Sequence, residues 1–369
     1  MQKDNMSNIF YIVTMCVFFL CCSCQNKRNM NKFEWNVSVS GSKYYTIYNI
    51  KTKFICDDKS PVYVLTQFPS VYEEWGEYGS IELTGRKRSL PTQLYTQWLS
   101  CTEGESGQIY EAIIDLPYDT ILNIFQKGYI YQEPDGKISQ NEYSNVVVGL
   151  APGGVVSLWI CGSYRRVQVG YWLAHKLPLN DEIFASRGGQ HKWVRQLLSE
   201  DLDYIPDYIK NQVFSEKQWV DYNNKYLSRY KIKFESEDVN IVDVRTEYYN
   251  GELYHLYPFN DTVYYQRACP KRIYIGWKQD GNIFDAFIQF DKEYLFNNID
   301  KLNENPNSKI DFIFNINKYN NKIECYLSNQ IDTIELPDKY RKIKIFMNRK
   351  GIYSNYSGNE IKYESQNYL

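Results

Sequence analysis

The sequence predicts an α+β protein that is mostly β, with antiparallel sheets, short helices packed on them, and two pseudo-repeated β-rich units joined by a helical connector. Short runs in which aromatic or β-branched residues alternate with polar ones fill most of the 369 residues, and this alternation is typical of half-buried strands. Gly, Pro and Asn separate the runs, as they do in turns. Apolar residues at helical spacing occur only in a few short stretches.

The chain begins with a short apolar segment that ends in a cluster of small residues. The run 9–20 is shorter than the roughly 20 residues of a transmembrane helix, and it has the length of a signal-peptide core. It ends in FFLCCSC, which resembles a bacterial lipobox, where a small residue precedes the cysteine that receives the lipid. We therefore expect a lipoprotein signal peptide over 1–23, a lipid on Cys24, and a polar tether over 24–32. An ordinary signal peptide, or a lipid on Cys22, is the alternative.

The proposed anchor places the protein in the cell envelope. A lipid on Cys24 would hold an otherwise soluble body at a membrane surface, and we expect the outer membrane, with the body facing the periplasm. The formal net charge of −2 gives no reason to expect nucleic acid as a partner. The cysteines after the anchor are odd in number and none forms a CxxC pair, so we assign no disulfide, zinc ribbon or redox motif.

The first β-rich unit is expected over 33–177. Its predicted strands are listed here in order: 33–39, 44–55, 61–68, 92–100 and 108–116. The last two read as a hairpin across the turn 103–107, and 69–90 reads as a long loop. A short helix follows from Pro117, with Ile121, Ile124 and Phe125 on one face and Gly128 as its stop.

The stretch NVVVGLAPGGVVSLWICG at 145–162 has two possible interpretations. Gly149 and Gly154 match the glycines of a phosphate-binding loop, but Val155 and Val156 stand where that motif requires Lys and Ser or Thr. A phosphate loop also leads into a helix, whereas an apolar, β-rich run follows here. We therefore predict two buried antiparallel strands joined by a tight turn.

The segment 178–237 is expected to be a helical connector. Its clearest helical signal lies in SEKQWVDYNNKYLSRY, where aromatic residues recur at the spacing of one helix face. These residues are Trp219, Tyr222, Tyr226 and Tyr230. Ser215 and Gln218 have the form of a capping box at its start.

The second β-rich unit, 238–369, resembles the first in the order of its patterns. The Trp-bearing run 90–100 parallels 269–279, and the strand and helix at 109–125 parallel 283–299. A further strand pair follows each helix, at 145–162 and at 309–329. The sequence therefore predicts an internal repeat, and two unrelated β-rich segments with similar turns are the alternative.

Three stretches of the first unit resemble one known family. LPTQLYTQWLS, IYEAIIDLPYDTILNIF and VVVGLAPGGVVSLWICG look like domain-of-unknown-function family 2931 (DUF2931), which comprises bacterial proteins of unknown function, many of them classed as lipoproteins. The resemblance covers 33–175, and the GLAPGG turn before Trp159 is its most specific element. It implies export and lipidation, and it implies no activity.

The residues that usually carry catalysis form no motif in this sequence. His175, His191 and His255 have none of the spacings of metal ligands, and no serine lies in a G-x-S-x-G context. We therefore assign no catalytic residue, no metal ligand and no cofactor. The carboxylates are dispersed, so an envelope-polymer hydrolase whose carboxylate pair lies among Glu111, Asp115 and Asp285 stays the alternative.

Basic residues gather between Ser163 and Arg195, with few acidic residues among them. Five of them form a predicted partner-binding patch: Arg165, Arg166, Arg187, Lys192 and Arg195. Such a patch could contact an acidic partner or anionic lipid headgroups. A solvated surface is the alternative.

These observations favour a non-catalytic role. We predict a lipid-anchored envelope protein that contacts the membrane through its lipid and binds a protein or a glycan. The protein partner could be a toxin, as for an immunity lipoprotein. A glycan is favoured if the abundant tyrosines, 35 in number, line a groove.

Overall fold

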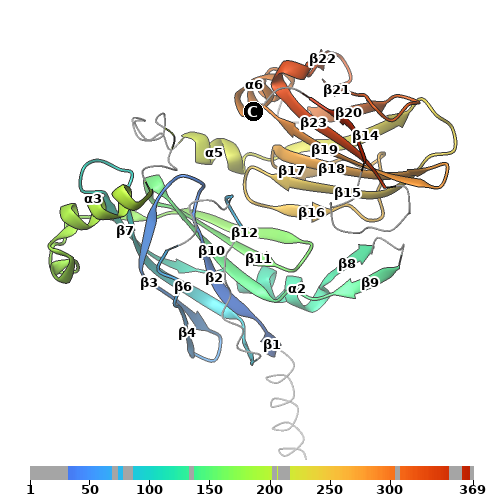
Figure 1. Cartoon of the computed structure of the whole chain (residues 1–369). Coiled ribbons are helices and arrows are strands. Elements are labelled where there is room, and N and C mark those ends of the chain that lie inside the picture. Colours follow the sequence, from blue (N-terminus) through green and yellow to red (C-terminus); the bar gives the residue numbers. More distant parts are fainter. Residues whose placement is uncertain are drawn as a thin grey trace, which may run out of the picture.

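The computed structural model describes residues 32–68, 74–77, 86–132, 137–201, 206, 217–303, 308–348 and 360–365. The predicted signal peptide, Cys24 and the tether up to residue 31 lie outside the described residues. Two β-sandwiches lie side by side in Figure 1, and helices are short and few among the described residues. The prediction of a mostly β, α+β fold with antiparallel sheets is confirmed. No helix in the described ranges is long and apolar enough to cross a membrane.

The first sandwich packs part of a large sheet against a five-stranded sheet. The strands on the large-sheet side are β2 (Asn36–Ser40), β10 (Asn145–Ala151), β11 (Val155–Cys161) and β12 (Arg166–Leu173). The facing sheet has the order β13 (His175–Leu177), β7 (Gln108–Asp115), β6 (Pro91–Ser100), β3 (Ile47–Cys56) and β4 (Pro61–Val64). Apolar side chains from both sheets form one core between them.

Several predictions for this unit are confirmed. β6 and β7 form the expected hairpin, and α2 (Tyr118–Lys127) buries Ile121 and Phe125 and ends before Gly128, whose φ is +57°. β10 and β11 are buried along their whole length and pair antiparallel. The 3₁₀ turn Pro152–Gly154 joins them, so this stretch is a strand–turn–strand element and does not lead into a phosphate-binding helix.

Two short ribbons in this unit were not predicted. β1 (Lys32–Glu34) pairs with β5 (Lys87–Ser89), so the predicted strand 33–39 is broken at Trp35, and part of the expected loop 69–90 is a strand. β8 (Tyr129–Gln132) and β9 (Ile138–Asn141) form a hairpin in a stretch for which no strand was predicted.

The second sandwich is built in the same way. Its share of the large sheet has the order β16 (Leu253–His255), β15 (Asn240–Tyr248), β18 (Pro270–Gln279), β19 (Asn282–Phe290), β23 (Arg341–Asn348) and β24 (Glu360–Glu364). Its facing sheet has the order β17 (Tyr265–Arg267), β14 (Tyr226–Phe234), β20 (Lys309–Ile316), β21 (Ile323–Ser328) and β22 (Thr333–Glu335). α6 (Lys292–Leu302) packs on this core through Leu295, Ile299 and Leu302, and the 3₁₀ turn Asp338–Tyr340 precedes β23.

The two units have the same strand connectivity. β14 pairs parallel with β20 as β2 pairs parallel with β10, and every other corresponding pair is antiparallel in both units. One helix follows the β6–β7 hairpin, and one follows β18–β19. The units do not join through equivalent edges, because β12 of the first meets β16 of the second, and this pairing makes the ten-stranded sheet continuous.

The connector is only partly helical. Its described elements are the 3₁₀ turn Ala185–Arg187, α3 (Gln190–Asp201) and α5 (Lys217–Asn223). The predicted helix through Tyr226 and Tyr230 is wrong, since both residues belong to β14 and point into the core. A spacing of four residues fits a helix face and also one face of a strand, and the alternate burial of Tyr226, Ser228 and Tyr230 shows the strand. Ser215 lies outside the described residues.

Candidate functional site

The two units are fixed to each other by buried contacts around a short segment, 74–77. Arg166 is buried, and its guanidinium donates hydrogen bonds to the carbonyl oxygens of Gly251 and, at 2.8 Å, of Gly76. The indole Nε1 of Trp159 donates to the carbonyl of Asn250 at 3.1 Å. The ring centre of Trp75 lies 5.0 Å from that of Trp159. The bonds from Arg166 to Gly251 and from Trp159 to Asn250 cross from the first unit to the second, so buried contacts set the geometry between the units.

A partly buried ion network adds to this joint. The carboxylate of Glu74 accepts hydrogen bonds from Lys271 and, at 2.9 Å, from Arg272, and it lies 3.6 Å from the Lys43 ammonium. Arg272 also binds Glu247 at 3.0 Å. Burial disfavours the ionised carboxylate, but the cations around it outweigh burial and hold the pKa of Glu74 below its usual value.

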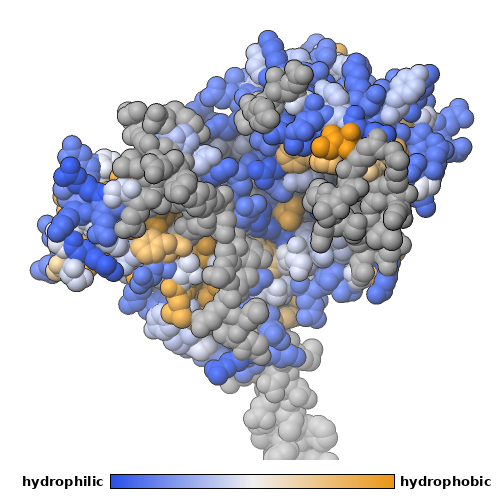
Figure 2. Space-filling view, viewed as in Figure 1, coloured by the Kyte–Doolittle hydropathy of each residue, from blue (hydrophilic) through white to orange (hydrophobic). Residues whose placement is uncertain are grey.

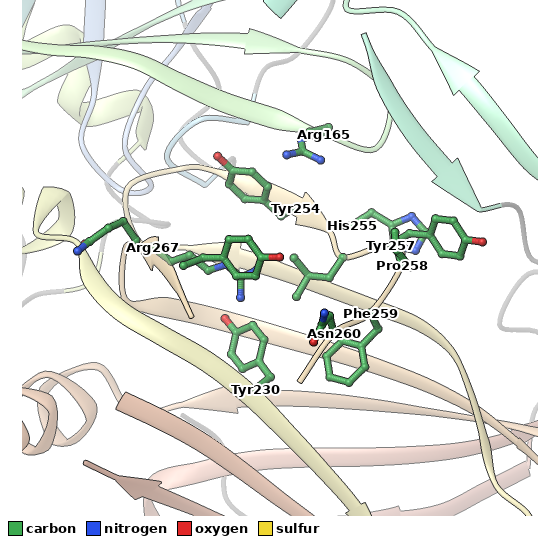
Figure 3. A pocket seen from close by; sticks show the side chains of 12 residues that line it. Arg165, Tyr230, Tyr254, His255, Tyr257, Pro258, Phe259, Asn260 and Arg267 are labelled. Atoms are coloured by element: carbon green, nitrogen blue, oxygen red, sulfur yellow. The ribbon is translucent and has the colours of Figure 1, made fainter. Parts of the chain in front are cut away.

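A pocket of about 330 Å³ opens beside this joint, and we call it the junction pocket. Residues of β16, of β17 and of the loop between them line it, and Figure 3 shows Arg165 from the first unit beside them. Its lining residues are Arg165, Tyr230, Tyr254 and those at 255–260 and 265–267. Most of them are aromatic, cationic or polar.

Arginine side chains lie on tyrosine rings in this pocket. The Arg165 guanidinium is 4.7 Å from the ring centre of Tyr254, and that of Arg267 is 4.5 Å from the ring of Tyr265. Arg165 Nε is buried and has no hydrogen-bond partner among the described residues. Burial raises the pKa of Tyr230 and of Tyr254, so both phenols stay protonated. Tyr230 donates its hydroxyl to Tyr248 at 3.3 Å, and Tyr254 donates to Glu252 at 3.1 Å.

His255 forms one wall of the pocket. Its Nε2 lies 2.7 Å from Asp243 Oδ1, and its buried Nδ1 has no hydrogen-bond partner in the described part of the chain. Tyr131, from the β8–β9 hairpin of the first unit, packs its ring 4.8 Å from the imidazole. Tyr164 stacks on Tyr131 with ring centres 3.8 Å apart. The hairpin that the sequence did not predict therefore helps to shape the site.

A second cavity, of about 270 Å³, runs along the outer part of β7. It contains two of the carboxylates that the sequence offered for a hydrolase, Glu111 and Asp115. Glu111 accepts a hydrogen bond from Tyr95 at 2.7 Å and lies 3.3 Å from His175. Four residues along a strand place the Cα atoms of Glu111 and Asp115 about 13 Å apart, which does not favour the roughly 5–9.5 Å carboxyl separations of glycosidases. Asp285 belongs to β19 of the other unit.

The structure does not bring the five predicted basic residues together. Arg165 lines the junction pocket, and Arg166 is buried in the joint. Arg187, Lys192 and Arg195 lie around α3, at the other end of the first unit in Figure 1. The Arg187 guanidinium covers the ring of Trp193 at 4.4 Å. Figure 2 shows a mainly hydrophilic face on which apolar side chains occur in separate patches.

Most of the junction pocket was not predicted from the sequence. The signal was the run YHLYPFN at 254–260, which combines aromatic residues with turn formers. Its peptide bond Tyr257–Pro258 is cis. Of the other histidines, His175 belongs to β13 and His191 lies 3.2 Å from Ser106. No cluster of three or more metal-binding side chains occurs in the described ranges.

The described cysteines are all buried and form no disulfide with one another, and they are Cys56, Cys101, Cys161, Cys269 and Cys325. Burial raises the pKa of Cys161 and of Cys325 to about 12. Their thiols therefore stay protonated near neutral pH, as in cysteines that serve packing.

Comparison with known proteins gives one match. The family model for a protein of unknown function (DUF2931) matches residues 23–217, which is more than half of the chain and includes the segment whose motifs predicted it. No curated protein and no solved structure matches the chain. The matched segment contains the first sandwich and the segment 74–77 that fixes the two units together. The chain therefore belongs to the DUF2931 family.

Proposed function

We propose that this protein is a lipid-anchored, non-catalytic protein of the cell envelope, and that it binds an anionic glycan in the junction pocket. The observation that carries the proposal is the lining of that pocket, which offers two arginines, several tyrosines and an imidazole. None of its described lining residues bears a carboxylate. The surroundings therefore favour a ligand that brings negative charge and hydroxyl groups.

The chemistry of these side chains fits a charged sugar. The faces of Tyr254 and Tyr265 can pack on the C–H faces of a sugar ring, while phenol oxygens of the pocket accept hydrogen bonds from its hydroxyl groups. The planar fork of an arginine binds a carboxylate or phosphate through two parallel hydrogen bonds. Arg165 lines the pocket, and its Nε has no hydrogen-bond partner among the described residues, so its guanidinium is one candidate for such a group.

The proposed anchor rests on the sequence FFLCCSC before Gln25. The tether from Cys24 to Lys32 can reach at most about 28 Å, so the body would stay close to the membrane. The test is mass analysis of the N-terminal peptide from the native host, with Cys24→Ser as the variant. We expect an acylated cysteine as the first residue and no acyl group in the variant. A chain that keeps its first 23 residues would contradict the anchor.

Binding is tested with two related probes, a uronic-acid tetrasaccharide and its neutral, carboxyl-reduced form. We expect the acidic form to bind about tenfold more tightly, which corresponds to about 1.4 kcal/mol. Arg165→Ala and Arg267→Ala should each weaken binding. Arg187→Ala, which also removes an arginine from an aromatic ring but far from the pocket, is the matched control. Equal binding of both probes, or equal loss in all three variants, would argue against the proposal.

Experiments with the same protein distinguish glycan binding from two other roles. A protein partner, such as a toxin neutralised by an immunity lipoprotein, is indicated if the glycan does not bind and a secreted effector is encoded beside this chain. An envelope-polymer hydrolase is indicated if incubation with the polymer releases new reducing ends, which binding alone cannot do.

A further inference from the structure

The strand β7 has an incomplete neighbour, whereas its counterpart in the second unit has a complete one. β13 pairs with β7 at only three residues, Ile109 to Glu111. β23 pairs with β19 along eight residues, from Ile283 to Phe290. The outer edge of β7 from Ala112 to Asp115 pairs with no strand in the described ranges.

β7 has an incomplete neighbour because the chain passes from one sheet to the other at Ala174, between β12 and β13. β12 ends at Leu173, which pairs with Val155 in the large sheet, and β13 begins at His175 in the facing sheet. Between them, Ala174 donates its N–H to the carbonyl of Gly154 at 2.7 Å. The chain therefore leaves β7 after Glu111, and the fork that results is the second cavity described above.

The fork leaves apolar and acidic groups exposed side by side. The cavity is lined by β7 residues and by the run Trp172 to His175. Ile113 is 66% exposed and Leu173 is 57% exposed. Asp115 is exposed on the same face of β7 as Ile113, while Ala112 and Ile114 face the core. An open strand edge flanked by apolar groups is a template for strand addition.

The second unit shows which kind of strand completes this arrangement. Residues 109–116 correspond to 283–290, and the helices that follow begin at the corresponding residues Tyr118 and Lys292. Ala112 to Asp115 thus correspond to Ala286 to Gln289. Their partners on β23 are Lys342 to Ile345, in which lysines alternate with buried isoleucines.

We propose that the groove along β7, from Ala112 to Asp115, binds an extended segment of a partner protein as an added antiparallel strand. The segment carries alternating β-branched apolar and basic residues. Its apolar side chains lie over the core beside Ala112 and Ile114. Its basic side chains lie on the outer face, near Glu111 and Asp115, where opposite charges on neighbouring strands attract. Backbone hydrogen bonds supply affinity, and the charge pattern supplies specificity.

The site differs in place and charge from the junction pocket. The β7 groove is acidic and apolar and belongs to the first unit alone, whereas the junction pocket is cationic and needs both units. The groove therefore selects a basic peptide, and an anionic glycan is a poor match for it. If the peptide does not bind to the β7 groove, the proposal for the junction pocket still stands, and the reverse also holds.

The probe is a synthetic peptide with the sequence of residues 341–348, RKIKIFMN, added to the full chain. We expect binding with a Kd of about 100 µM or tighter, as a short added strand can give. Asp115→Lys should weaken it about tenfold, and a peptide with both lysines replaced by glutamate should bind that variant better than the original chain. Glu182→Lys, on an exposed turn, is the charge-matched control and should change nothing.

A structural readout accompanies the titration. Amide hydrogen exchange at residues 112–115 should slow when the peptide is present, and Arg165→Ala should leave this protection unchanged. No binding at about 1 mM peptide, or binding that Asp115→Lys leaves unaltered, would overturn the proposal. Binding with protection confined to β19 would show exchange with the chain's own β23, and it would overturn the proposal as well.

Discussion

The guanidinium of Arg165 lies 4.7 Å from the ring centre of Tyr254, so a turn of the first unit covers a strand of the second. The next residue, Arg166, is buried in the joint and donates to two backbone carbonyls. Adjacent arginines thus do different things, one beside a pocket and one inside the protein.

The two arginines should differ in their effect on stability. Arg165→Ala removes one cation–π contact and should lower the free energy of unfolding by about 0.5–1 kcal/mol. Arg166→Ala leaves two buried carbonyls without donors and should cost about 3 kcal/mol or more. Urea unfolding of both variants measures the difference. Equal losses would contradict this description of the joint.

The ion network around Glu74 predicts a pH dependence. The pKa of Glu74 is lowered in the folded state, so its stabilisation is present above the unfolded value of about 4.3 and is lost as pH falls through the folded value. Glu74→Gln leaves Lys271 without its partner and should cost roughly 2–3 kcal/mol near pH 7, less than for a fully enclosed pair because the carboxylate is 18% exposed.

The measurement is the free energy of unfolding from pH 3 to pH 7, with the wild type falling more steeply toward acid than the variant. Glu324→Gln is the control, because Glu324 pairs with Lys322 at an exposed site and should have much less effect. A variant with the same slope as the wild type would show that Glu74 does not contribute to the acid dependence.

A larger side chain in the glycine-rich stretch should clash with its neighbours. A methyl group at Gly149 would lie 2.4 Å from ring carbons of Trp159 and 2.7 Å from the Trp75 ring. Gly149→Ala should therefore destabilise the protein by about 3 kcal/mol, at the upper end for overpacking. Gly104→Ala meets nothing within 4 Å but requires a φ of +75°, and it should cost about 1 kcal/mol. Thermal unfolding of both variants tests this order, and similar losses would contradict it.

The buried cysteines predict a pattern of alkylation. The pKa of Cys56 is raised to about 11 and that of Cys161 to about 12, both chiefly by burial. Iodoacetamide at pH 8 should therefore leave the five described cysteines unmodified in the folded protein, and all five should react in denaturant. Intact mass before and after unfolding counts the adducts. Rapid labelling of one cysteine in the native state would show that its site opens.

The elements predicted correctly are those whose sequence pattern fits only one kind of secondary structure. β10 and β11 are apolar on both faces around Pro152 and two glycines, and α2 has apolar residues at helical spacing before Gly128. Tyr226 and Tyr230 were misassigned because their spacing fits a helix and a strand alike, and the facing strand β20 decides between them. Propensity gives way to tertiary pairing at such positions.

The junction pocket was beyond reach of the sequence for a different reason. Arg165 and the run 254–267 are distant in the chain and meet only because β12 pairs with β16. The predicted basic patch grouped residues by their nearness in sequence, but Arg166 turns inward while Lys192 and Arg195 belong to α3. Nearness in the chain says little about nearness in space for residues on separate loops.

The joint between the units decides what can be produced as a working fragment. A polypeptide cut at residue 217, where the family match ends, would keep Trp159 and Arg166 but lose Asn250 and Gly251, to whose carbonyls they donate. It would also lack Lys271 and Arg272, so Glu74 would lose both of these cationic partners. Such a truncation would leave an indole N–H, a guanidinium and a carboxylate facing solvent beside uncovered tryptophans. Expression trials should therefore carry the chain through both sandwiches.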